Sequence, residues 1–277
     1  MKALFLGNSH LSAFKLAHND LDRKLLPECL FYCAGATNLR YTKVTDGKLI
    51  PTDSADLCFD DFRYFMPELA VKLMQEYSVN RKPWGIDVRQ QFVMTGGTEE
   101  IDLEDVGAIF YVCGISPYDF VRLGVKDMPI TRSLWSVMLI RLLGSGFLLY
   151  EQISEIRKLN SKCRHYFIGG PLISLPDSNQ LELKSLVSRS NRNIIMPMVK
   201  DYLFDDVYMP NEVLLDESLL GTKSIFCRGG VMESIAFQKV GVESQGIAET
   251  ETDRFHMNKN YGSAVFRDFI FEKLIGI

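Results

Sequence analysis

Short apolar runs that end at glycine recur along this chain and constrain its fold more than any other feature. The runs are Lys2–Gly7, Cys29–Ala34 before Gly35, Gly107–Cys113 before Gly114, and Arg164–Ile168 before Gly169. Each run has the length of a buried strand, and glycine permits the turn that ends it. The sequence therefore predicts four core strands.

Stretches with helical periodicity separate these runs, among them Leu11–Asn19, Phe147–Asn160 and Asn258–Leu274. In Leu11–Asn19 the apolar residues fall on one side of a helix. Strands that alternate with helices favour a parallel sheet covered on both faces. The predicted fold class is α/β, a three-layer α/β/α flavodoxin-like parallel sheet. We expect residues 1–277 to form a single domain.

Two segments between the second and third predicted strands interrupt this rhythm. Arg40–Pro51 holds an Asp-Gly pair between β-prone residues, which is a strong hairpin signal. Gln90–Ile101 holds a Gly-Gly pair and predicts a second hairpin. The sequence thus predicts a hairpin-containing insertion at about residues 40–102. A later segment, Asn193–Pro210, mixes apolar runs with two prolines and gives no single prediction.

Composition excludes several classes of partner. The net charge is −4 and the basic residues do not cluster, so we expect no nucleic-acid partner. No apolar run approaches about 18 residues, so we expect no membrane-spanning helix. The six cysteines form no Cys-x-x-Cys pair, which is typical of buried thiols in a cytoplasmic protein. Metal-ligand spacing, a Gly-x-Gly-x-x-Gly motif and a phosphate loop are also missing, so no metal or other cofactor is expected.

Ser9 follows the first predicted strand directly. Ligands of open parallel sheets bind at the carboxyl ends of the strands, so Ser9 lies at the functional edge. It also stands at the start of a predicted helix, where free N–H groups favour developing negative charge. Serine is equally a favoured helix N-cap, so a nucleophile and a cap are both possible roles for Ser9.

Asp253 and His256 are the candidate partners of the serine. A serine hydroxyl needs a base to remove its proton, and the base needs a partner that fixes its tautomer. An Asp three residues before a His in one loop can reach Nδ1 and leave Nε2 for the hydroxyl. We expect His18 and His165, in a predicted helix and strand, to be structural, and His10 to line the pocket.

The combination resembles the SGNH (GDSL-like) hydrolase family across the chain. Gly7-Asn8-Ser9-His10 resembles the first block, with Asn8 where Asp is usual, and Gly35 resembles the second-block glycine. Asp253 and His256 resemble the last block. The continuation from His256-Met257-Asn258 to Tyr261-Gly262 is similar to the ending of members that begin Gly-Asn-Ser-His. The resemblance implies a catalytic triad of Ser9, Asp253 and His256, with Ser9 and Gly35 in the oxyanion hole.

The third block of the family supplies an Asn side chain to the oxyanion hole, and this chain has none there. The third predicted strand instead continues through Gly114-Ile115-Ser116-Pro117-Tyr118. The Ser116 hydroxyl, or the amides of Gly114 and Ile115, are the alternative donors. We expect Asn8, His10, Gly114 and Tyr118 to line the pocket.

Three functions are compatible with these residues. The first is a serine ester hydrolase, an esterase or deacetylase acting on a small-molecule or carbohydrate ester. The second is an O-acyltransferase in which a sugar hydroxyl replaces water. The third is a non-catalytic relative that binds a glycan or a protein. Cys33 and Cys113, near strand ends, are rival nucleophiles, but their sequence neighbours are apolar and predict core thiols.

Overall fold

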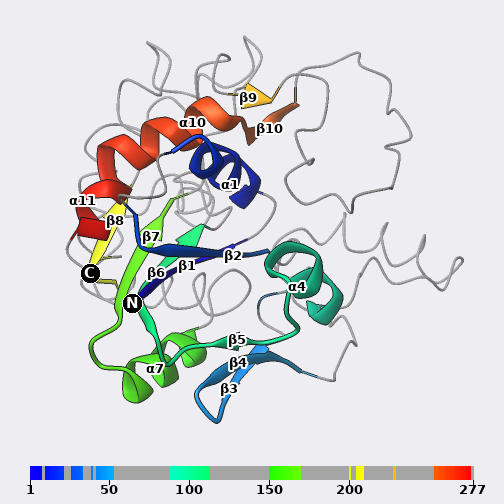
Figure 1. Cartoon of the computed structure of the whole chain (residues 1–277), viewed down its shortest axis with the longest axis vertical. Helices are drawn as coiled ribbons and strands as arrows, with labels where there is room; N and C mark the ends of the chain where they lie inside the picture. The colour runs from blue at the N-terminus through cyan, green and yellow to red at the C-terminus, as the bar shows by residue number, and fades with distance from the viewer. Residues whose placement is uncertain are drawn as a thin grey trace, which may run out of the picture.

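The computed structural model describes residues 1–7, 10–21, 26–33, 39, 42–52, 88–112, 150–169, 200, 204–208, 227–228 and 253–275. These residues form strands, α-helices and one π-helical turn, η6 (Figure 1). The elements are β1 Lys2–Gly7, α1 Leu11–Asn19, β2 Glu28–Cys33, β3 Thr42–Thr45, β4 Lys48–Pro51, α4 Val88–Gly96, β5 Ile101–Asp102, β6 Val106–Val112, α7 Tyr150–Leu159, β7 Arg164–Ile168, β8 Asp206–Tyr208, β9 Cys227–Arg228, β10 Asp253–Met257, α10 Lys259–Val265, η6 Phe266–Ile270 and α11 Phe271–Ile275.

Five parallel strands form the central sheet, in the order β2-β1-β6-β7-β8. The chain starts inside the sheet with β1, adds β2 on one side, and then builds β6, β7 and β8 on the other side. The direction of winding therefore reverses between β1 and β6. The α/β class and the four predicted core strands are confirmed, whereas the short strand β8 was not predicted.

Both faces of the sheet are covered. Alternate residues of a strand point to opposite faces, so Leu4 and Phe5 of β1 belong to two different apolar clusters. One cluster joins the sheet to α1, α10, η6 and α11, and the other joins it to α4, α7 and β3–β5. Figure 1 shows these two groups of elements on opposite sides of the sheet. All seven residues of β6 are buried, as expected for a strand covered on both sides.

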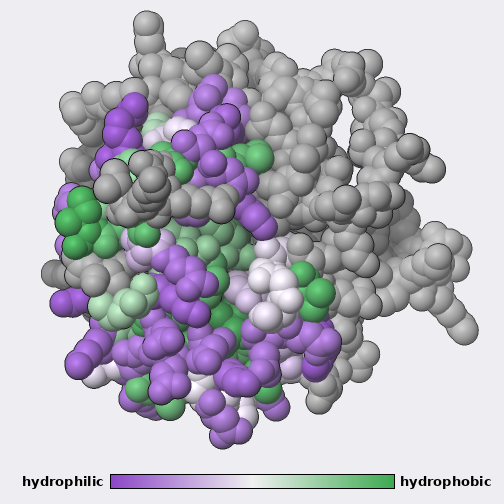
Figure 2. Space-filling model, viewed as in Figure 1, coloured by the Kyte–Doolittle hydropathy of each residue, from purple (hydrophilic) through white to green (hydrophobic). Residues whose placement is uncertain are grey.

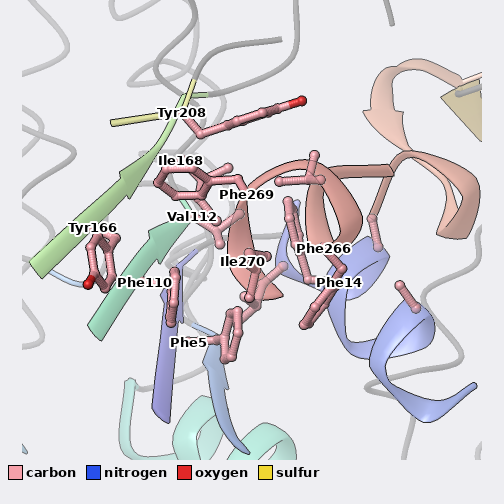
Figure 3. Close-up of a cluster of buried hydrophobic side chains, with 14 of the residues drawn as sticks. Phe5, Phe14, Phe110, Val112, Tyr166, Ile168, Tyr208, Phe266, Phe269 and Ile270 are labelled. Carbon is pink, nitrogen blue, oxygen red and sulfur yellow. The ribbon is translucent and has the colours of Figure 1, made fainter. Parts of the chain in front are cut away.

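An aromatic row crosses the first of these faces. Phe5 stacks on Phe31 at 4.7 Å and on Phe110 at 4.8 Å between ring centroids, and Phe110 stacks on Tyr166 at 5.0 Å. The rings are register partners on β2, β1, β6 and β7, so the pairing of the strands places them in line. Figure 3 shows Phe5, Phe110 and Tyr166 in this row, with Phe266 and Ile270 of the last helix packed over it.

The first predicted hairpin is confirmed. Strands β3 and β4 pair antiparallel around a two-residue turn, and β4 also pairs with β5. Both turn residues have positive φ, 50° at Asp46 and 76° at Gly47, as the twist of a tight hairpin requires.

The second predicted hairpin, at Gln90–Ile101, is wrong. That segment begins with helix α4, which ends at Gly96. Gly97 has φ 88° and its N–H donates to the carbonyl of Val93, which is the geometry of a helix C-terminal cap. A Gly-Gly pair can end a helix or form the turn of a hairpin. Only the tertiary contacts of α4 show that this pair ends a helix.

The predicted helix over Asn258–Leu274 is confirmed by α10, η6 and α11, which follow one another without a break. The predicted helix over Phe147–Asn160 matches α7 within the described residues. Figure 2 shows mostly hydrophilic residues over α7 and β3. Among the described residues, the exposed large apolar side chains are scattered, at Met1, Val93, Leu159 and Ile275.

Candidate active site

The carboxyl ends of β2, β1 and β6 are level with one another. Gly7, the last residue of β1, pairs with Cys33 at the end of β2 and with Val112 at the end of β6. A Cβ on Gly7 would lie 2.1 Å from the Val112 carbonyl oxygen, so the two backbones approach as closely as glycine allows. Since the winding reverses between β1 and β6, this edge is the topological switch point at which open α/β sheets bind ligands.

Three residues of the predicted site follow these strand ends at equal spacing in the sequence. Ser9, Gly35 and Gly114 each come two residues after Gly7, Cys33 and Val112, respectively. The structure thus places the strand ends that lead to them side by side. Several predicted site residues lie outside the described residues, namely Asn8, Ser9, Gly35, Gly114, Ser116 and Tyr118.

The start of α1 bears on the two roles considered for Ser9. His10 occupies the N-cap position with helical φ and ψ of −67° and −20°, and its side chain makes no capping hydrogen bond. An N-cap residue normally has non-helical φ and ψ, so the helical values at His10 leave both roles of Ser9 open. His10 is partly buried at the switch-point edge, next to Ser9 in the chain. Its predicted place in a pocket stays a prediction.

The segment with Asp253 and His256 is strand β10, not the predicted loop. Residues three apart in a regular strand point to opposite sides, which would separate the two side chains. The pairing is irregular, however, because Asp253 is opposite Arg228 and Met257 is opposite the adjacent Cys227. An advance of four residues along β10 thus corresponds to an advance of one residue along β9, so β10 is not a regular strand between Asp253 and Met257. A local contact between the Asp253 carboxylate and the His256 ring stays a prediction.

Helix α10 links this strand to α1. Asn258 caps α10, because its Oδ1 accepts a hydrogen bond from the Tyr261 N–H at 3.2 Å. Met257, the residue after His256, is buried in the same apolar cluster as Leu11, the first residue of α1. Figure 1 shows α10 beside α1, with β10 leading into α10.

The contact between the two helices is close. A Cβ on Gly262 would lie 2.3 Å from the Ala13 carbonyl oxygen, and Tyr261 packs edge-on against Phe14 at 6.2 Å. Asn258, Tyr261 and Gly262, part of the motif at the end of the chain, therefore start α10 and fit it onto α1. The two halves of the predicted triad therefore come just before two helices that contact each other: Ser9 before α1, and Asp253 with His256 before α10.

The cysteines divide into two environments. Burial, followed by the nearby Glu28 carboxylate, raises the pKa of Cys29 to about 12. Burial, followed by Asp205, raises the pKa of Cys163 to about 12 as well. Both side chains are thiols at neutral pH, as predicted. Cys33 differs, because it lies near Lys15: burial lowers the pKa of Lys15, and the interaction with Cys33 opposes part of that shift.

The neighbours of Cys33 in the sequence are apolar, but its neighbours in space include the Lys15 side chain. Cys33 is the last residue of β2 and Lys15 is in the second turn of α1, so the contact forms only when the helix packs beside the strand. No spacing in the sequence signals it.

A second polar group lies on the opposite face of the sheet. His165 of β7 is fully buried, and its Nδ1 is 3.0 Å from the Tyr111 hydroxyl. Its backbone N–H donates to Asp205 Oδ2 at 2.7 Å. Burial, with a smaller effect from Arg157, lowers the His165 pKa to about 4. The structural role predicted for His165 is confirmed.

Among the described residues, no group of three or more His, Cys, Asp or Glu side chains is arranged to hold a metal ion. No helix in the described part of the chain is both long and apolar enough to cross a membrane. Comparison of the chain with protein-family models, with curated proteins and with solved structures gives no match. The resemblance to SGNH hydrolases therefore rests on the residues of this chain.

Proposed function

We propose that the protein is an SGNH-type serine ester hydrolase, with Ser9 as nucleophile, His256 as general base and Asp253 as the partner of His256. The observation that carries the proposal is the switch point between β1 and β6, because Ser9 follows β1 by two residues there. The strand order β2-β1-β6-β7-β8 also supports the finer description of a three-layer flavodoxin-like fold, since it matches that doubly wound order.

In the proposed reaction, His256 Nε2 takes the proton of the Ser9 hydroxyl as its oxygen attacks the acyl carbonyl. His256 then gives that proton to the leaving alcohol as the ester C–O bond breaks. Water, deprotonated by His256, attacks the acyl-enzyme and releases the acid with free Ser9. The amides of Ser9 and Gly35 stabilise the oxyanion in both steps, and the positive end of the α1 dipole adds to them.

The third oxyanion donor is the weakest part of the site. Removal of one such donor costs on the order of 100- to 1,000-fold in turnover. The Ser116 hydroxyl, four residues after the end of β6, is the proposed replacement for the missing Asn. We expect turnover to be slow if Ser116 contributes nothing.

The substrate class is a small-molecule or carbohydrate ester. Cys29, Cys33 and Cys163 carry no disulfide, which supports the expected cytoplasmic location. A transferase with the same residues would need an acceptor sugar for turnover, and a binding protein would lack an activated serine. One experiment separates the three.

The experiment is labelling by a fluorophosphonate probe, together with hydrolysis of p-nitrophenyl esters of several acyl lengths. We expect the wild type to be labelled, and Ser9→Ala to lose labelling and about 1,000-fold or more of the turnover. Ser12→Ala is the matched control, because Ser12 is the buried second residue of α1, three positions after Ser9. Equal labelling and turnover of wild type and Ser9→Ala would show that Ser9 is not the nucleophile.

A further inference from the structure

Helix α4 of the insertion packs on the carboxyl end of β2. Phe92 of α4 is fully buried and meets the Tyr32 ring edge-on at 5.4 Å. The Tyr32 hydroxyl is hydrogen-bonded to Thr98, just beyond the end of α4. The end of α4 is thus fixed beside the last residues of β2, which is the edge strand of the sheet.

Thr95, in the last turn of α4, joins two elements that are distant from it in sequence. Its hydroxyl accepts a hydrogen bond from the Cys33 N–H at 3.0 Å, and its carbonyl accepts one from Lys15 Nζ at 2.9 Å. The first bond satisfies an amide on the outer side of the edge strand. The second places a cation at the C-terminus of α4, where the helix dipole favours positive charge.

These two elements lead to the two groups on which the proposed reaction depends. Cys33 ends β2 two residues before Gly35, and Lys15 belongs to α1, which begins two residues after Ser9. We infer that Thr95 is a positioning residue for the proposed ester hydrolysis, because it fixes the end of β2 relative to α1. The inference rests on the proposed function.

The expected effect is on the chemical step. An oxyanion donor must lie at hydrogen-bond distance from the charge that develops, and a displacement of about 1 Å costs about 100-fold. Without the Thr95 hydroxyl, the hydrogen bond from the Cys33 N–H to Thr95 is lost and the end of β2 is less constrained. Substrate binding does not require this constraint, so kcat should fall while KM changes little.

The test compares three variants in ester hydrolysis. Thr95→Val keeps the shape of the side chain without the hydroxyl, and we expect kcat to fall about 10- to 100-fold with KM within about threefold of wild type. Thr95→Ser keeps the hydroxyl and should restore kcat. Thr98→Val is the matched control: it loses hydrogen bonds to the Tyr32 hydroxyl and to the Glu100 carbonyl but none to the β2 backbone, and should keep the wild-type kcat.

Amide hydrogen exchange at Cys33 gives a measurement that does not depend on turnover. Exchange should accelerate in Thr95→Val and stay slow in Thr95→Ser. If Thr95→Val does not fold, Lys15→Met takes its place, because it removes the hydrogen bond from Lys15 to the Thr95 carbonyl. A fall in kcat at unchanged KM then supports the positioning role, and an unchanged kcat overturns it.

The outcomes separate the two proposals. An active wild type that requires Ser9, together with a folded Thr95→Val of unchanged kcat, would overturn the positioning role and leave the hydrolase standing. A rise in KM at unchanged kcat would also overturn it, because Thr95 would then act in binding. A wild type without labelling or turnover would overturn both.

Discussion

The two faces of the parallel sheet are built differently. The face under α1 and α10 is filled by aromatic rings that follow the strand register, and it holds together elements from both ends of the sequence. The face under α4 and α7 holds the insertion, and among its buried residues are Tyr111 and His165, joined by a hydrogen bond. The first face is therefore mainly aromatic packing, with the buried His18 ring against Phe31 and Phe266, and the other carries the hydrogen-bonded pair of Tyr111 and His165.

The aromatic face supports the geometry of the candidate site. Its rings fix β1 between β2 and β6, and Phe266 of the last helix packs on Phe5 at 5.7 Å. Aromatic pairs contribute about 0.5–1.5 kcal/mol each beyond the area they bury. The contact of α10 with α1 depends on this packing, and so does the position of β10.

The largest expected effect comes from Phe5 and Leu4, adjacent residues of β1 that are both fully buried on opposite faces. Phe5→Ala removes the central ring of the aromatic row and should lower the free energy of unfolding by about 3–5 kcal/mol. Leu4→Ala should cost about 2–5 kcal/mol and less than Phe5→Ala, because no ring stack is lost. Urea unfolding of the two variants measures the difference. If Leu4→Ala is the less stable of the two variants, the aromatic face does not contribute more to stability at this strand than the opposite face.

The next effect is a pH dependence that belongs to the other face. The His165 pKa is about 4 in the folded protein, against about 6.5 in an unfolded chain. Between these values the unfolded chain binds the proton and the folded protein does not. His165 therefore leaves stability unaffected above pH 6.5 and removes up to roughly 3 kcal/mol as the pH falls through 6.5 towards 4.

The measurement is the free energy of unfolding across this pH range, for wild type and His165→Gln. The groups that face His165 are Tyr111 on β6, Asp205 before β8 and Arg157 on α7. Gln cannot titrate, so the variant should lose this part of the pH dependence whatever its absolute stability. Parallel curves for the two proteins would show that folding does not lower the His165 pKa.

The smallest effect concerns the cap of α10. Asn258→Ala removes the side-chain oxygen that accepts the Tyr261 N–H and should cost about 1 kcal/mol. Asn258→Asp keeps an acceptor and should cost much less. Thermal unfolding measures both variants. Equal losses would mean that residue 258 matters for a reason other than capping.

The strands could be predicted from the sequence because burial on both faces leaves continuous apolar runs, and glycine ends them. The helix α4 could not, because the Gly-Gly pair at its end is also a hairpin signal. Strand β8 has only three residues, too few for a pattern. The role of Gly262 in close packing depends on which helix lies opposite, whereas the Asn258 cap is a local interaction at the start of α10.

For the candidate site, too, some features could be predicted from the sequence and others could not. Ser9 at a strand end could be predicted from the order of elements, since a parallel sheet brings its carboxyl ends to one edge. That Asp253 and His256 belong to an irregular strand could not, because the partner strand is 25 residues upstream of Asp253 at Arg228. The bonds of Thr95 to Cys33 and Lys15 span 62 and 80 residues and leave no local signal.

The contact of Phe5 with Phe266 has a consequence for biosynthesis. The two residues are 261 positions apart (266 − 5), so the aromatic row stays uncovered until the last helix has left the ribosome. Exposed rings on an unfinished sheet are prone to aggregation, and contacts this distant in sequence form slowly. The nascent chain should therefore bind chaperones through β1 until η6 has emerged from the ribosome.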